Sequence, residues 1–198
     1  MSRKSILATA VLILSVSRPS FAAGVRVTLI IDEPILPVGQ TTTAHLFAEV
    51  WQDPQPDNGI YAYALNVLAD SLGPVGIDSV TQLGSPDPFL SDPGTILPDG
   101  LHDVYGGDGG YFADQNRGIG SPFEVLSLEL RGLAEGTVTF TAGVADSAAL
   151  LGITDGFLLQ QPGSVDTTFE SVTVTVIPEP SALAFLAFAV AALGRRRR

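Results

Sequence analysis

Apolar side chains alternate with polar ones along most of the sequence between residues 24 and 177, and this alternation constrains the fold more than any other feature. Because successive side chains of a β-strand point to opposite sides, a period of two predicts strands with one buried face. The pattern predicts strands at 25–31, 44–50, 60–69, 76–83, 126–130, 138–144 and 172–176. Segment 60–69 is apolar at both alternating sets of positions, which predicts a central strand.

The connections between these strands favour an all-β fold, an antiparallel immunoglobulin-like β-sandwich, because strands follow one another without alternating helices. Residues 133–136 predict a tight turn that joins two strands into a hairpin, and 147–151 predict only a helical turn. Residues 52–59 hold two prolines and end in Asn-Gly, which indicates a loop. Residues 84–122 exceed ordinary loop lengths, so they form a functional loop, a partly disordered one, or one with short strands such as 96–97.

The segment 24–177 is strongly acidic. It holds 20 of the 21 acidic side chains and only three basic ones (Arg26, Arg117 and Arg131), so its formal charge is −17 against −11 for the chain. This charge argues against a nucleic-acid partner, because phosphate binding needs a basic surface. The sequence contains no cysteine, which excludes disulfides, thiolate metal sites and a cysteine nucleophile.

Residues 1–22 have the organisation of a signal peptide. Two basic residues are followed by an apolar run over 6–16, and small side chains precede a cleavage site between Ala22 and Ala23. An uncleaved anchor is the alternative, but this run is short beside the roughly twenty apolar residues that span a bilayer. The sequence therefore predicts an N-terminal signal helix, export through the inner membrane by the export machinery, and cleavage by signal peptidase.

The C-terminal segment, residues 178–198, is organised as well. Pro178, Glu179 and Pro180 precede an apolar run over 181–194, and four arginines follow it: Arg195, Arg196, Arg197 and Arg198. A helix over 181–194 rises about 21 Å, against a hydrocarbon core of about 30 Å. This short hydrophobic helix spans a bilayer only with local thinning, which favours a transient anchor. The positive-inside bias would keep the arginines in the cytoplasm.

This tail resembles the PEP-CTERM sorting signal of bacterial exported proteins. The resemblance rests on three elements in fixed order: the Pro178-Glu179-Pro180 tripeptide, the apolar run and the arginines. It implies that an exosortase-type membrane protease recognises the tail and cuts near the tripeptide. The protein would then pass to the cell surface or an extracellular polysaccharide matrix; a tail that stays in place as an anchor is the alternative. The signal predicts where the protein is located and does not indicate the activity of the domain.

The order of segments in the domain resembles the cohesin and related carbohydrate-binding-module type of immunoglobulin-like sandwich. The resemblance rests on an early strand at 38–41, the strand that begins at Gly59 and the late segment 125–141. It spans most of 25–176 and implies the fold alone. The acidic insertion 84–122 departs from a compact cohesin, so dockerin binding is not carried over.

Catalytic motifs are missing from the sequence: it has no Gly-x-Ser-x-Gly, no His-Glu-x-x-His and no glycine-rich phosphate loop between a strand and a helix. His45 alternates with Leu46 in a predicted strand, which predicts a surface histidine. Glycoside hydrolysis needs two carboxylates flanking a sugar bond, and among so many acids such a pair is always conceivable. A secreted hydrolase is therefore the least favoured function.

Two binding hypotheses remain. Asp99, Asp103 and Asp108 lie among glycines, and carboxylates on tight turns suit calcium, although the spacing is not that of an EF-hand and a solvated acidic loop is the alternative. Trp51 and Tyr111 lie at or in loops and offer aromatic surfaces to sugar rings.

We therefore predict a non-enzymatic exported protein with a structural or adhesive role at the cell surface or in the extracellular matrix. A carbohydrate- or calcium-dependent binding module is the alternative. The predicted partners are the export machinery, signal peptidase, an exosortase-type protease and extracellular polysaccharide; calcium is the one cofactor considered.

Overall fold

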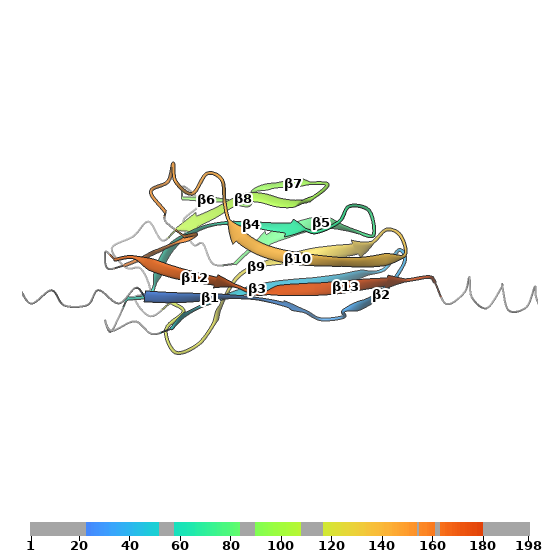
Figure 1. The fold of residues 1–198 in the computed structure, drawn as a ribbon, viewed down its shortest axis with the longest axis horizontal. Coiled ribbons are helices and arrows are strands. Elements are labelled where there is room, and N and C mark those ends of the chain that lie inside the picture. The colour runs from blue at the N-terminus through green and yellow to red at the C-terminus, as the bar shows by residue number, and fades with distance from the viewer. Residues whose placement is uncertain are drawn as a thin grey trace, which may run out of the picture.

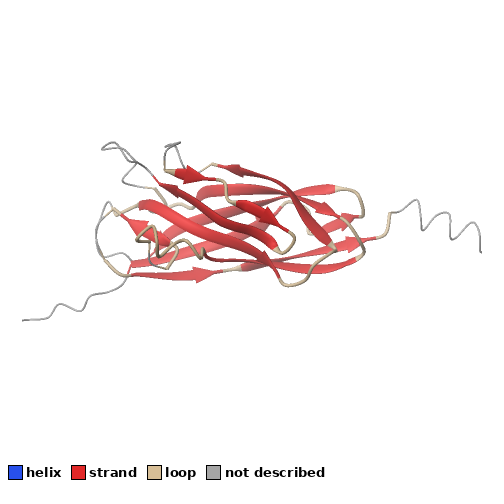
Figure 2. Ribbon diagram, turned by 90° about the horizontal axis from the view of Figure 1, so that it is seen from above, coloured by secondary structure: helices blue, strands red, loops and turns tan. Residues whose placement is uncertain are grey.

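The computed structural model describes residues 23–51, 58–83, 90–107, 117–153, 155–160 and 163–179. Both predicted hydrophobic helices lie outside these residues. Within them the protein is all-β, and its strands form two sheets whose strands run along the long axis of the molecule (Figures 1 and 2). The predicted β-sandwich is thus confirmed.

The first sheet has five strands in the order β12-β1-β3-β9-β5. The strands are β12 (Val165–Phe169), β1 (Ala23–Ile31), β3 (Thr41–Trp51), β9 (Phe123–Gly132) and β5 (Val75–Gln82). All neighbours pair antiparallel except β1 and β12, which are parallel. We call this the five-stranded sheet.

The second sheet has the order β2-β13-β10-β4-β8-β6. Its strands are β2 (Ile35–Pro37), β13 (Ser171–Ile177), β10 (Gly136–Val144), β4 (Ile60–Ala69), β8 (Gly100–Gly107) and β6 (Ser91–Asp92). Two short strands complete it: β11 (Phe157–Leu159) pairs with β4, and β7 (Thr95–Leu97) pairs with β8. Strand β4 lies between β8 on one side and β10 and β11 on the other, as its apolar sequence predicted.

The hydrophobic core lies between the two sheets and follows the predicted alternation. Leu126, Leu128 and Leu130 of β9 are at most 1% exposed, and the same holds for the alternating valines at the start of β1. Burying each such side chain contributes on the order of 1.5–3 kcal/mol. One predicted core residue, Val144, is 41% exposed because β10 ends there and the chain leaves the sheet.

The structure corrects the predicted hairpin at 133–136. Strand β9 belongs to the five-stranded sheet, where β3 and β5 occupy both its edges, and β10 belongs to the other sheet. The turn therefore carries the chain from one sheet to the other. Gly136 makes this crossing with a φ of +150°, and a Cβ there would lie 2.8 Å from Pro74. Alternation alone does not specify which sheet a strand joins.

Two further expectations change. Residues 38–40, which the cohesin resemblance placed in an early strand, form a turn in which the Gln40 N–H donates to the Pro37 carbonyl over 3.1 Å, and β3 begins at Thr41. The long stretch 84–122 contains the predicted short strand, as β7, and also the eight-residue strand β8. Strand β8 was not predicted, because it begins and ends with glycines and because a register shift interrupts its alternation.

Candidate functional site

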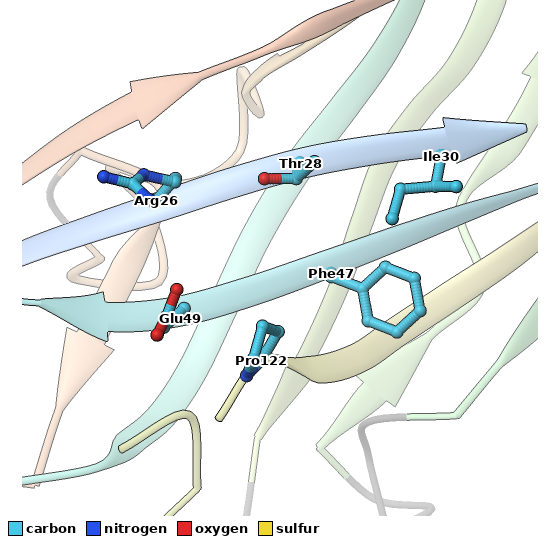
Figure 3. A pocket seen from close by; sticks show the side chains of 6 residues that line it. All are labelled: Arg26, Thr28, Ile30, Phe47, Glu49 and Pro122. Atoms are coloured by element: carbon cyan, nitrogen blue, oxygen red, sulfur yellow. The ribbon is translucent and has the colours of Figure 1, made fainter. Parts of the chain in front are cut away.

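The outer face of the five-stranded sheet carries a groove of about 310 Å³ (Figure 3). The register of β1 against β3 sets opposite one another Arg26 and Glu49, then Thr28 and Phe47. These four side chains line the groove together with Ile30 and Pro122. The groove thus combines an apolar floor with one cationic and one anionic group.

Arg26 is the cation of this groove. Its guanidinium lies over the Trp51 ring, 5.6 Å from the ring centroid, and among the described residues it makes no ion pair, although Glu49 is its cross-strand partner. Trp51 can lie at this position because its own cross-strand partner is Gly24, where a Cβ would lie 2.5 Å from Trp51 Nε1. The predicted sugar-stacking residue Trp51 is thus part of this face, beside the groove and covered in part by Arg26. Tyr111 lies outside the described residues.

A histidine between two carboxylates lies beside the groove. His45 Nδ1 hydrogen-bonds Glu124 Oε1 over 2.5 Å, His45 Nε2 lies 3.5 Å from Asp32 Oδ1, and the imidazole stacks on Phe47 with centroids 6.3 Å apart. The hydrogen bond to Glu124 raises the pKa of His45, because it favours the charged imidazolium. The prediction of a surface histidine agrees with its part-exposed position in β3.

Glu124 was not predicted as the partner of His45. Strict alternation with Leu126 would turn Glu124 toward the core. The register of β9 against β3 shifts at Leu46 and Phe47, so that Phe47 pairs with Glu124 while Leu46 pairs with Leu126. This β-bulge buries Val125 and turns Glu124 to the outer face. A bulge leaves no clear mark in hydrophobic periodicity, which is why the pair could not be found from sequence.

The predicted calcium residues are only partly described. Asp99 Oδ1 lies 3.0 Å from His102 Nε2, and Asp103 Oδ1 accepts the Ser147 N–H over 3.0 Å. This hydrogen bond from Ser147 lowers the pKa of Asp103. No group of three or more acidic or histidine side chains suited to a metal ion occurs within the described ranges. Asp108 falls outside them, so the calcium site stays a prediction.

The predicted processing tripeptide lies directly after the last strand. Strand β13 ends at Ile177, whose carbonyl accepts the Val38 N–H over 3.0 Å, and Pro178 and Glu179 follow at once. At the other terminus, β1 begins at Ala23, whose N–H donates to the Ser164 carbonyl over 3.1 Å. Ala22, Pro180 and Arg195–Arg198 lie outside the described residues. No helix among the residues described is long and apolar enough to cross a membrane.

Comparison with known proteins identifies the tail. Residues 176–198 match the PEP-CTERM protein-sorting motif. The chain therefore carries this sorting signal, which implies an exported surface protein. A search of curated protein sequences found no match.

Solved structures similar to this chain include cohesin modules, the domain type that the sequence resembles. One is the cohesin module of a family 33 glycoside hydrolase from Clostridium perfringens, with 15% identity, a TM-score of 0.44, and coverage of 80% of this chain and 100% of that chain. Another is a type II cohesin domain from the cellulosome of Acetivibrio cellulolyticus, with 13% identity, a TM-score of 0.46, and coverage of 77% and 95%.

Proposed function

We propose that this chain is a non-enzymatic structural or adhesive protein of the cell surface or extracellular matrix, delivered there by its PEP-CTERM tail. The observation that carries the proposal is the sorting motif at 176–198, which begins at the end of the last strand. A protease that cuts near Pro178–Pro180 would remove the tail and leave every strand of the sandwich intact, because the last strand, β13, ends at Ile177.

The charge of the domain supports a place outside the cell. A formal charge of −17 keeps copies of the domain apart and soluble, and it limits non-specific contact with other acidic surfaces. In this proposal, signal peptidase cuts between Ala22 and Ala23, and the mature sandwich runs from Ala23 to the processing tripeptide.

The test is sorting in the native host. Replacement of the tripeptide by three alanines (Pro178→Ala, Glu179→Ala and Pro180→Ala) should hold the protein in the inner membrane and deplete it from the surface and medium. Glu33 and Pro34 form another exposed Glu-Pro pair, so Glu33→Ala with Pro34→Ala is the matched control and should leave sorting unchanged. Normal surface delivery of the triple variant would contradict the proposal.

A carbohydrate-binding module is the second candidate, and the groove of Figure 3 favours it. Phe47 offers an apolar surface to a sugar ring, while Arg26 and Glu49 offer a hydrogen-bond donor and an acceptor that no ion pair joins to each other. The ligand class we propose is a neutral saccharide of the extracellular polysaccharide. A strongly anionic one would be repelled by the domain as a whole.

Retention on polysaccharide from the host tests this candidate. Arg26→Ala should weaken binding about tenfold or more, because a hydrogen bond to a charged group contributes about 1.5–3 kcal/mol. Thr141→Val, on the outer face of the other sheet, is the control. Equal retention of both variants would exclude the groove. Turnover of the polysaccharide, abolished by Glu124→Gln, would instead support the hydrolase.

A further inference from the structure

The end of the sandwich from which the tail departs is built from tightly connected turns (Figure 1). Backbone hydrogen bonds join the turn at 38–40 to the end of β9 and the turn at 133–135 to Pro74. Another joins the end of β4 to Asp99. The bonds are Gly39 N to Gly132 O at 2.8 Å, Leu133 N to Pro74 O at 2.8 Å, and Ala69 N to Asp99 O at 2.9 Å. The Val38 N–H also donates to the Ile177 carbonyl, so the end of β13, after which the tail begins, lies at this same end of the sandwich.

Large apolar side chains are exposed on two connections at this end, 70–74 and 133–135, and on the short strand β7 at the same end. Leu72 is 64% exposed, Leu133 53%, Leu97 44% and Ile96 38%, and all four border one hollow of about 530 Å³ together with Pro98. We call these four side chains the apolar tip. Turns are usually polar, because their backbone faces water, and a group of exposed apolar side chains marks a contact surface.

We propose that the apolar tip rests on the phospholipid bilayer while the sorting segment holds the chain in the membrane. This inference rests on the proposed function. The motif begins at residue 176, and the apolar run begins at Ser181. From Ile177 to Ser181 the chain extends at most about 14 Å. A tail that enters the bilayer therefore keeps this end of the sandwich at or a few ångströms above the headgroups, whose layer is about 5–8 Å thick on each side.

Acidic side chains beside the apolar tip determine which lipid headgroups it can contact. Asp70, Asp99 and Glu135 lie on the same connections as the apolar tip, so anionic headgroups would be repelled. The tip therefore suits zwitterionic lipid. Its contact lays the processing tripeptide at the membrane surface, where a membrane protease acts. Cleavage removes the short covalent link between the domain and its membrane segment. The apolar tip is then no longer held at the bilayer, and the domain can dissociate.

The chain lends itself to a direct test because it contains no cysteine. The chain that remains after signal-peptide removal, from Ala23 to Arg198, is reconstituted in phosphatidylcholine vesicles as a single-cysteine variant, Leu72→Cys or Leu133→Cys, each carrying an environment-sensitive fluorophore. The control is Leu150→Cys. Leu150 is 90% exposed in the turn after β10, at the opposite end of the sandwich from Leu133. Flotation of the vesicles reports separately whether the tail anchors the chain.

We expect blue-shifted emission at positions 72 and 133, with quenching by headgroup-labelled lipid, and neither change at position 150. Both effects should persist when the protein is diluted to about one chain per vesicle. Floating vesicles without these changes would overturn the tip contact and leave the anchoring tail intact. Changes that vanish on dilution would show that a second copy covers the tip, which also overturns the inference. A chain that does not float would contradict both the inference and the proposed anchoring.

Discussion

Asn66 is a buried polar side chain on the central strand β4, and we predict that the fold depends on it. It is 5% exposed, its Oδ1 accepts the Asp103 N–H over 2.7 Å, and its Nδ2 lies 3.5 Å from the Val144 carbonyl oxygen. The register of β4 against β8 shifts between Leu65 and Val67, so the ladder does not supply Asp103 with an ordinary partner. Asp103 has a φ of 54° here, and Asn66 supplies the acceptor its N–H needs.

Asn66→Ala should lower the free energy of unfolding by about 2 kcal/mol. Loss of Oδ1 leaves the Asp103 N–H without its acceptor, which costs about 1–3 kcal/mol, and the 3.5 Å contact adds little. For a domain of this size the midpoint of thermal unfolding should fall by about 4–8 °C. Urea unfolding followed by circular dichroism measures the change in the free energy of unfolding. Thr141→Val, on the exposed face of the neighbouring β10, should stay within about 0.5 kcal/mol. An Asn66→Ala domain as stable as this control would refute the reasoning.

Three further predictions follow from the same structure. His45 has a raised pKa, so its pairing with Glu124 stabilises the fold fully below about pH 6.5, and this stabilisation is lost as pH rises through the folded-state value. The free energy of unfolding should therefore fall as pH rises above about 6.5, and it should fall less in Glu124→Gln, where Asp32 is the one carboxylate left beside His45. Gly100→Ala should prevent stable folding, because a Cβ there overlaps the Val67 carbonyl oxygen at a φ of +145°, whereas Gly143→Ala meets nothing within 4 Å and should be tolerated; thermal unfolding compares the two. If the predicted calcium site exists, millimolar calcium should raise the melting temperature above that in chelator, and an unchanged value would remove it.

Periodicity located most strands because their residues bury one face. The four alternating positions from Ala44 to Val50 are all at most 7% exposed, and β4 has the bounds predicted from its continuous apolar run. Sheet membership could not be predicted in the same way. A strand that turns its apolar face inward satisfies the pattern in either sheet, so the turn at 133–136 was assigned to a hairpin although it crosses between sheets.

The arrangement of residues at the candidate groove could not be predicted from alternation either, because it depends on strand register. Trp51 could be selected as a surface aromatic, but its placement over Gly24 and under Arg26 depends on the register of β1 against β3. Glu124 reaches His45 only through a bulge. The tail is different, because its recognition depends on a linear order of residues and needs no tertiary structure, and the match to the sorting motif confirms it.

Intact mass spectrometry of the protein recovered from the surface and medium of its host tests the central claim most directly. The proposal predicts a species that begins at Ala23 and ends near the Pro178-Glu179-Pro180 tripeptide, without the apolar run and the arginines. A surface species that still carries Arg195–Arg198 would contradict it, and the tail would then be a permanent anchor.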